Sequence, residues 1–352
     1  MTDSSSPPKI ILPTNCPDNK VQLQEKTKGR SLTADAFERL LHNRAAVIGA
    51  ILVLMNILIA LFAPMLAPKE YADATLADSN SAPLWVTKIF TGMKPIEDGG
   101  YIKVNNEYFL GADKLGRDLW SRIAYGSRIS LAVAIVGPTI SILIGFLVGL
   151  FAGYNGGYID NLLMRFVDIM YAFPTMLLII LLMAFFRAGI GIDDNSLIGM
   201  LSDLDSSMGG LFFIFVGIGL TAWMGAARLV RAQTLCAREN EYVVAARALG
   251  APTRRIILKH ILPNIIGPLI ITETMSIPSY ISYEAFLSFI GLGVNPPTPS
   301  WGGMISEGAL TIQTYPNQAL FPALALFLLI FAFNFLGDGL RDALDPTLRG
   351  KE

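Results

Sequence analysis

A basic stretch between residues 228 and 263 has the clearest potential for chemistry in this sequence. It carries seven Arg or Lys residues against two acids, and long apolar runs flank it on both sides. In a membrane protein, an excess of Lys and Arg marks the loops that stay in the cytoplasm. Taken alone, the stretch therefore predicts a cytoplasmic loop whose charge fixes the orientation of neighbouring membrane spans.

The local pattern within this basic stretch predicts two helices joined by a corner. Residues 229–249 contain no Gly or Pro, so a single helix is predicted there. Gly250 can adopt positive φ and end that helix. Pro252 stands where a second helix would begin, a position that tolerates the missing N–H. Pro263 is predicted to end the second helix.

A second charged stretch, residues 110–131, alternates acidic and basic side chains. Catalysis would need a nucleophile or base with an orienting partner, and no such arrangement is visible here. The charges are instead predicted to pair with one another in a solvated collar near the membrane surface. The collar residues are Asp113, Arg117, Asp118, Arg122 and Arg128.

The common signatures of enzymes and metal sites are absent from the sequence. There is no phosphate-binding Gly-x-x-x-x-Gly-Lys-Ser/Thr, no His-Glu-x-x-His and no Gly-x-Ser-x-Gly. Two histidines and two cysteines form no metal-ligand pattern. No catalytic residue, no metal and no cofactor bound by this chain itself is therefore predicted.

Composition indicates the elements that carry these stretches. Hydrophobic residues make up 53% of the chain and charged residues 16%, and the mean hydropathy is +0.50, which is typical of a polytopic membrane protein. The predicted fold is all-α with six transmembrane helices. The predicted spans are residues 45–63, 130–152, 168–186, 210–227, 263–283 and 319–337.

The distribution of Lys and Arg orients these spans. The segment 1–44 and the basic stretch have seven each, whereas the short loops 188–209 and 284–318 have none. Both ends are therefore predicted to be cytoplasmic. The predicted organisation is an N-terminal tail at 1–44, an extracytoplasmic loop at 64–129, a core at 130–338 with a cytoplasmic loop at 228–262, and a C-terminal tail at 339–352.

Glu273 and Pro278 lie inside the fifth predicted span. Ionisable groups at membrane depth are costly and usually face a bundle interior or an aqueous cavity. Two roles are open for Glu273: a place on a translocation pathway, with Pro278 beside it, or a hydrogen bond between helices.

Four stretches resemble the C-type membrane subunit of dipeptide, oligopeptide and nickel importers of the ABC class. The first is Leu110–Leu131, in which the family's Gly-Thr-Asp is Gly111-Ala112-Asp113. The others contain Gly153–Gly157, Leu287–Gly302 and Asn334–Pro346, all in the family's order. The resemblance implies the transmembrane domain of a type I importer.

The basic stretch resembles the cytoplasmic loop with which such subunits contact their ATPases. The family pattern is Glu-Ala-Ala, three residues, Gly, nine residues and Ile-x-Leu-Pro; Val244 replaces its Glu and His260 replaces its Ile. Glu241, one helical turn before Val244, is the candidate substitute for the lost carboxylate. The coupling residues implied by the resemblance are Glu241, Ala245, Ala246, Gly250, Arg254, Arg255, Leu262 and Pro263.

The resemblance also implies partners for this chain. They are a homologous membrane subunit in a heterodimer, two ATPase subunits that use ATP and Mg, and an extracytoplasmic substrate-binding protein, in addition to membrane lipid and without nucleic acid. Di- or oligopeptides are the implied cargo, with nickel chelates or another small solute as alternatives. An ion-coupled secondary transporter is a further alternative, which an inverted repeat would favour; none is visible.

Overall fold

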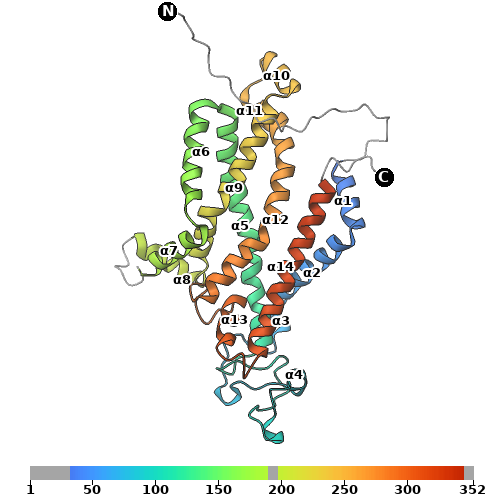
Figure 1. Ribbon diagram of the computed structural model, residues 1–352, viewed down its shortest axis with the longest axis vertical. Helices are drawn as coiled ribbons and strands as arrows, with labels where there is room; N and C mark the ends of the chain where they lie inside the picture. Colours follow the sequence, from blue (N-terminus) through green and yellow to red (C-terminus); the bar gives the residue numbers. More distant parts are fainter. Residues whose placement is uncertain (1–31, 189–196, 345–352) are drawn as a thin grey trace, which may run out of the picture.

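The computed structural model describes residues 32–188 and 197–344, and the regular structure in these two ranges is helical (Figure 1). The only extended pairings among the described residues are three isolated β-bridges. The predicted all-α class is confirmed.

Five helical stretches are long and apolar enough to cross a membrane, and a bent pair of helices makes a sixth candidate. The five are α2 (Arg44–Leu61), α5 (Leu119–Asn155), α9 (Phe212–Arg238), the stretch Thr253–Phe289 that ends in α12 (Leu262–Phe289), and α14 (Asn317–Leu344). The pair is α6 (Gly157–Ala172) and α7 (Thr175–Ala188), bent by 81°. The predicted count of six is reached when this pair forms one span.

The bend between α6 and α7 lies inside the predicted span at 168–186 and coincides with Pro174. Phe173 is extended, with φ −85° and ψ 132°, and Pro174 follows it. A residue before proline is driven out of the helical region by the proline ring. The apolar run thus begins inside α6 and continues in α7 in a new direction.

Helix α5 lies at the centre of the bundle and packs closely against α9. Three glycines spaced four residues apart, Gly145, Gly149 and Gly153, face α9. A Cβ atom at Gly153 would lie 2.8 Å from the carbonyl oxygen of Arg231, and one at Gly149 would lie 2.8 Å from the Cβ of Val230. Small residues at this spacing allow two membrane helices to bring their backbones into contact.

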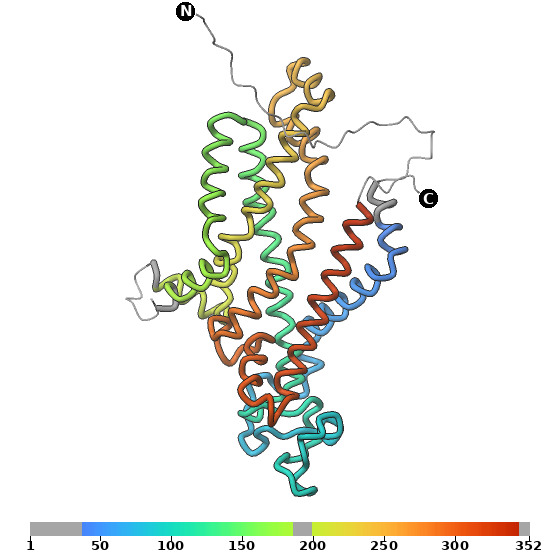
Figure 2. Tube along the Cα trace, viewed as in Figure 1, coloured from blue at the N-terminus to red at the C-terminus, as the bar shows by residue number. Residues whose placement is uncertain are grey.

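Helices α2 and α14 form a second pair beside α12 (Figure 2). A Cβ at Gly49 of α2 would meet the carbonyl oxygen of Ala332 at 2.7 Å, so this crossing is also close. The short helix α1 (Leu32–His42) contacts the last turns of α14, where Asn43 donates a hydrogen bond to Asp342 at 3.5 Å. Leu329 and Phe333 of α14 join Ile281 of α12 in one apolar cluster.

Residues 62–118, named here the α2–α5 segment, are folded around a small core, against which Tyr315 and Phe321 also pack. Ala82, Val86, Met93 and Ile102 are almost fully buried in it. The segment contains α3 (Ala63–Leu66), η1 (Leu76–Asp78), α4 (Leu84–Ile89) and η2 (Ile96–Asp98). It ends at residue 118 because α5 begins at Leu119, ahead of the predicted span start at residue 130.

The α2–α5 segment lies at the opposite end of the molecule from α10 (Glu241–Ala248) and α11 (Thr253–Ile256) (Figure 1). Two shorter helices complete the described residues, α8 (Leu197–Ser207) and α13 (Trp301–Ala309). The two charged stretches found in the sequence therefore occupy the two ends of the helical bundle.

Candidate coupling surface and polar network

The basic stretch forms a protrusion of two short helices, not the long helix predicted over residues 229–249. Helix α9 ends at Arg238 and α10 starts at Glu241. Asn240, at the N-cap of α10, is extended with φ −66° and ψ 140°, and its carbonyl oxygen accepts from the Val243 N–H at 2.9 Å. Asn is favoured at N-caps and disfavoured inside helices. We name residues 240–256 the α10–α11 segment.

Gly250 ends α10 in the left-handed conformation that the sequence predicts, with φ 76°. The Gly250 N–H donates to the carbonyl of Arg247 at 3.0 Å, and the Ala251 N–H donates to that of Ala246 at 3.1 Å. This pair of bonds is the Schellman motif, which closes a helix end and fixes the direction of the chain after it. Pro252 is the N-cap of α11, one position earlier than predicted.

Pro263 does not end a helix, so that prediction was wrong. A π-helical turn, η3 (Ile257–Ile261), joins α11 directly to α12, and Pro263 lies in the first turn of α12. The Leu262 N–H donates to the carbonyl of Ile257 in the wider turn. Because proline has no N–H and clashes with the carbonyl four residues earlier, the wider turn is a means of continuing the helix through it.

The inner face of the α10–α11 segment is fixed to the bundle. Val243 and Ile256 are almost fully buried, and they pack in one cluster with Val230 of α9 and Ile265 of α12. The Tyr242 hydroxyl accepts a hydrogen bond from the Asn264 side chain at 3.0 Å. The segment is therefore held by two membrane-crossing helices at once.

The outer face of the segment is open. Leu249 is 88% exposed and Val244 is 49% exposed. Of the predicted coupling residues, Glu241, Ala245, Gly250, Arg254, Arg255 and Pro263 are exposed, while Ala246 and Leu262 are half-buried. Neither Arg254 nor Arg255 has an ion-pair partner in the part of the chain that the structure describes. The surface combines unpaired positive charge with exposed apolar side chains.

Three other arginines of the basic stretch bind groups of α5 and α6 in the same chain. Arg228 pairs with Asp168 of α6 at 2.7 Å, and Arg231 pairs with Asp160 of α6. The Arg238 guanidinium donates to the carbonyl oxygens of Gly153 and Tyr154 at the end of α5. The positive charge of the stretch is thus divided between arginines that bind other helices of this chain and arginines without such a partner.

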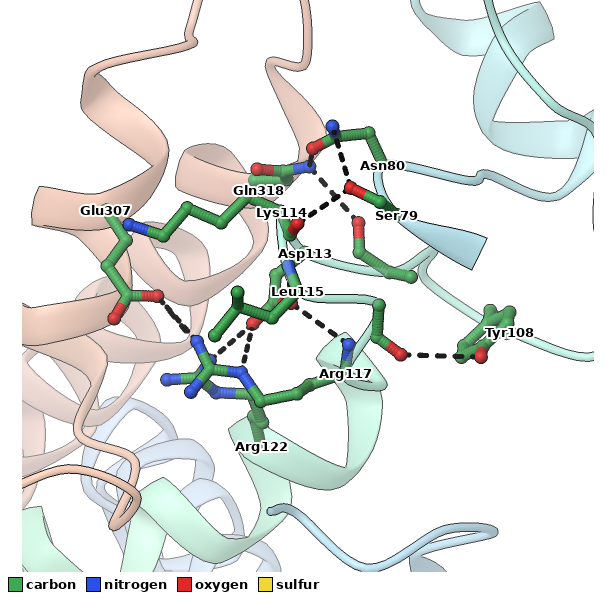
Figure 3. A network of polar contacts seen from close by, with 12 residues as sticks. Ser79, Asn80, Tyr108, Asp113, Lys114, Leu115, Arg117, Arg122, Glu307 and Gln318 are labelled. Atoms are coloured by element: carbon green, nitrogen blue, oxygen red, sulfur yellow. Dashed lines mark hydrogen bonds and ion pairs between the residues drawn. The ribbon is translucent and has the colours of Figure 1, made fainter. Parts of the chain in front are cut away.

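At the other end of the molecule, three of the five predicted collar residues form one buried network (Figure 3). The Asp113 carboxylate accepts from Arg117 Nε at 2.6 Å and also pairs with Arg122. All three side chains are at most 7% exposed, so the predicted solvated collar is wrong for them. Buried charges of this kind are tolerated only when they are paired and hydrogen-bonded.

Glu307 of α13 completes this network and was not predicted. Its carboxylate lies 3.0 Å from Arg117 and 3.5 Å from Arg122, and it is 36% exposed (Figure 3). The two positive charges of the arginines are therefore balanced by the two negative charges of the carboxylates. Gln318 of α14 also reaches the α2–α5 segment, donating to Asn80 Oδ1 at 2.9 Å. The only sequence signal for Glu307 is that it is acidic in a loop, 284–318, that lacks Lys and Arg.

The other two collar residues have separate roles. Asp118 is the N-cap of α5 and accepts from the Ser121 N–H at 2.7 Å and from its hydroxyl at 2.6 Å. Burial raises the pKa of the Asp118 carboxyl, although the bonds from Ser121 oppose that shift. Arg128 Nε donates to the carbonyl oxygen of Ala60 at 2.7 Å, at the end of α2.

Glu273 and Pro278 are both buried in α12. Glu273 is 3% exposed and accepts a hydrogen bond from the Tyr280 hydroxyl at 2.9 Å. This bond lies within one helix. The pathway role of the two residues stays a prediction. Across the described ranges 32–188 and 197–344, no cluster of His, Cys, Asp or Glu side chains has the arrangement of a metal site.

Comparison of the sequence with known protein families identifies the class of membrane protein. Residues 145–350 match the family described as "Binding-protein-dependent transport system inner membrane component", and residues 31–83 match "N-terminal TM domain of oligopeptide transport permease C". The chain belongs to this permease family. It is thus a multi-pass inner-membrane transport subunit, in a class of system whose ATP hydrolysis is performed by separate ATPases.

Individual relatives align along nearly the whole permease. The oligopeptide transport system permease protein OppC of Haemophilus influenzae is 41% identical over 322 residues, 92% of this chain and 91% of the relative. The dipeptide permease DppC of Bacillus subtilis is 37% identical, covering 92% and 88%. The glutathione permease GsiD of Pectobacterium atrosepticum is 35% identical, covering 89% and 90%. The resemblance drawn from the four sequence stretches is confirmed, and these matches give no support to an ion-coupled secondary transporter.

Among solved structures, the chain is similar to one of the inward-facing MetNI methionine ABC transporter. The identity is 19% and the TM-score 0.49, with 64% of this chain and 96% of that chain covered.

Proposed function

We propose that this permease is one half of the membrane channel of an ATP-driven importer of di- or oligopeptides. The assignment of peptides is supported by the relatives named for oligopeptide and dipeptide transport, which align over nine-tenths of the chain. The proposed partners are a homologous membrane subunit, two ATPases that bind ATP and Mg, and an extracytoplasmic binding protein. Nickel chelates or another small solute are the alternative cargo.

The proposed orientation has the α10–α11 segment and both chain ends in the cytoplasm. Loops 188–209 and 284–318, which have no Lys or Arg, then lie outside together with the α2–α5 segment. In this orientation the exposed surface of α10 faces the ATPases, and the network around Asp113 faces the binding protein.

The observation that carries the proposed mechanism is the contrast between the two faces of the α10–α11 segment. Its outer face exposes Leu249, Arg254 and Arg255, whereas its inner face is buried against α9 and α12. A partner that grips the outer face therefore moves two membrane-crossing helices together. Helix α5 follows α9 because the glycine contacts leave no gap between their backbones.

Alternating access follows from this coupling. When the ATPase dimer closes, the segment is displaced, α9 and α12 tilt, and the cavity between the two membrane subunits changes the side to which it opens. The exposed Val244 has lost the family's carboxylate, and Glu241 lies one turn before it with no ion-pair partner among the described residues. We propose that Glu241 supplies the carboxylate for the ATPase contact.

A matched pair of substitutions tests this role. Glu239 is a suitable control, because it is two residues away and its carboxylate already pairs with Arg238 at 3.0 Å. Glu241→Ala is expected to weaken co-purification of the ATPases by roughly tenfold, the effect of losing one charge-assisted hydrogen bond. Glu239→Ala is expected to leave it unchanged. Equal recovery of ATPases with both variants would contradict the assignment of Glu241.

The whole assignment is tested by purifying the tagged permease from its native membrane and identifying the proteins that accompany it. Two ATPases and a second permease are expected. The ligand of the associated binding protein is then measured with di- and oligopeptides and with a nickel chelate. Preference for the chelate would contradict the proposed peptide cargo but not the proposed importer. A complex without ATPases would contradict the proposal that this permease belongs to an ATP-driven importer.

A further inference from the structure

An apolar groove of about 630 Å³ lies between α2 and α5, with Phe333 of α14 in its wall. It runs along α2 from Val53 to Leu61, and Ile57 and Ile135 line it on opposite helices. Ile135 is 67% exposed. The proposed function uses neither this groove nor its one charged lining residue, Arg128.

Arg128 stands at the end of the groove where α2 terminates. Its Nε donates to the carbonyl oxygen of Ala60, and its guanidinium lies 4.9 Å from the centre of the Tyr125 ring. No carboxylate pairs with it among the residues that the structure describes, and its two terminal nitrogens have no hydrogen-bond acceptor there. The apolar run of α5 begins directly after it, at Ile129, so Arg128 lies at the boundary between hydrocarbon and headgroups.

The length of the groove favours a lipid over a transmembrane helix of another subunit. From Val53 to Leu61 the helix advances by eight residues, and at a rise of about 1.5 Å per residue the groove runs for about 12 Å. One leaflet contributes about 15 Å of the roughly 30 Å hydrocarbon core. An acyl chain of one leaflet therefore matches the groove, whereas a helix that crosses the membrane would need a groove of twice that length.

The charge at the end of the groove identifies the other part of the ligand. An unpaired guanidinium at the membrane boundary is stabilised by an anion, and guanidinium groups bind phosphate with two parallel hydrogen bonds. We propose that the groove binds one glycerophospholipid, with an acyl chain between Ile57 and Ile135 and its phosphate on the terminal nitrogens of Arg128. The lipid belongs to the leaflet on the side of the α2–α5 segment.

The test uses the complete transporter complex in phosphatidylethanolamine–phosphatidylglycerol vesicles. A small fraction of the phosphatidylglycerol carries a photoreactive diazirine in its acyl chain. After illumination, lipid adducts are mapped by mass spectrometry and are expected on the peptides that contain Ile57 and Ile135. Arg128→Gln is expected to lower their yield about tenfold, and Arg128→Lys, which keeps a charge for the phosphate, to lower it much less.

Two further variants separate the groove from general charge and folding effects. Arg165→Gln removes an exposed arginine of α6 that has no ion-pair partner within the described ranges, and it is expected to leave the yield unchanged. Ala132→Trp fills the groove from a half-buried wall position and is expected to abolish the adducts with Arg128 intact. If Arg128→Gln fails to assemble, the adduct yields of Arg128→Lys and Ala132→Trp test the proposal: adducts are expected with the first variant and not with the second.

Two outcomes would overturn the proposal. Equal adduct yields in the unaltered complex and in assembled Arg128→Gln would show that the phosphate is not held by Arg128. A photoreactive benzoylphenylalanine at position 135 that cross-links to another protein chain, and not to lipid, would show that a subunit of the transporter covers the groove.

Discussion

At the scale of single residues, Asp118 shows how a buried carboxylate can serve a structural purpose at a free-energy cost. Its side chain accepts two hydrogen bonds from Ser121 and thereby starts the longest helix of the described chain. Burial nevertheless raises the pKa of this carboxyl. The folded state therefore binds the proton of this carboxyl more tightly than the unfolded state does. For that reason Asp118 stabilises the fold most at low pH, and this contribution is lost as pH rises through the folded-state pKa.

The direction of this pH dependence gives a prediction for Asp118→Asn. Asparagine keeps an oxygen acceptor for Ser121 and is as good an N-cap as aspartate, but it carries no charge to desolvate. At pH 7 the variant is expected to be at least as stable as the unaltered permease, with the advantage vanishing near pH 4. Asp118→Ala is expected to lose about 1 kcal/mol through the missing cap. Thermal unfolding of the purified protein in detergent across this pH range measures both effects. Lower stability of the Asn variant at pH 7 would show that the charge is compensated.

The partners of the charged residues mark the limit of what the sequence predicts at this scale. Asp113, Arg117 and Arg122 were identified from their alternating signs, and two of their ion pairs are local. Their burial depends on Glu307, 190 residues after Arg117 in the chain. No local pattern connects these positions, because the contact exists only when α13 packs beside the start of α5.

At the scale of elements, the sequence predicted the centres of the helices better than their ends. Three of the five spans contain their whole predicted apolar run, and α2 and α9 each miss two residues at one end of theirs. The centres agree because exclusion from water determines which residues enter the membrane. The ends depend on tertiary contacts. Helix α5 extends back to Leu119 because Arg122 is neutralised by Asp113 and Glu307, and α12 continues back through Pro263 because a π-helical turn accommodates the proline.

The Schellman motif at Gly250 gives a prediction at this scale. Gly250→Val introduces a β-branched residue at φ 76°, which strains the backbone by roughly 1–2 kcal/mol although no atom lies within 4 Å of the new Cβ. The corner between α10 and α11 then changes direction. Ala246→Leu enlarges a half-buried position of α10 that is proposed to face the ATPase. Both variants are expected to insert normally, to keep basal ATP hydrolysis, and to lose transport and substrate-stimulated hydrolysis.

Membrane insertion, basal ATP hydrolysis, substrate-stimulated hydrolysis and transport are all measured on the same reconstituted complexes. Gly92→Val is the matched control, because this exposed glycine of the α2–α5 segment also has open space around it but no positive φ. It is expected to behave like the unaltered permease. Full transport by both Gly250→Val and Ala246→Leu would contradict a mechanical role for the α10–α11 segment and would leave its charge as an orientation signal only.

At the scale of the whole molecule, one helical stretch connects the two charged regions. Thr253–Phe289 begins in the α10–α11 segment and ends beside α13, whose Glu307 joins the network around Asp113. Trp301 at the start of α13 donates to the Ile123 carbonyl of α5 at 3.0 Å, and Gly126 leaves space for its ring. Displacement of α12 at one end is therefore transmitted to the contacts of α13 and α5 at the other.

The proposed orientation of the whole molecule is open to a direct test. Ser207 of α8 and Leu310 after α13 are exposed, and they lie in the two loops, 188–209 and 284–318, that contain no Lys or Arg. Leu249 and Thr253 are exposed at the opposite end. In a background with the native cysteines replaced, a cysteine at 207 or 310 is expected to react with a membrane-impermeant thiol reagent in spheroplasts. A cysteine at 249 or 253 is expected to react only after the membrane is permeabilised. All four sites are exposed in this chain, so in cells that lack the ATPases their accessibility differs only through the membrane. The reverse labelling pattern would place the α10–α11 segment outside, where no ATPase could reach it.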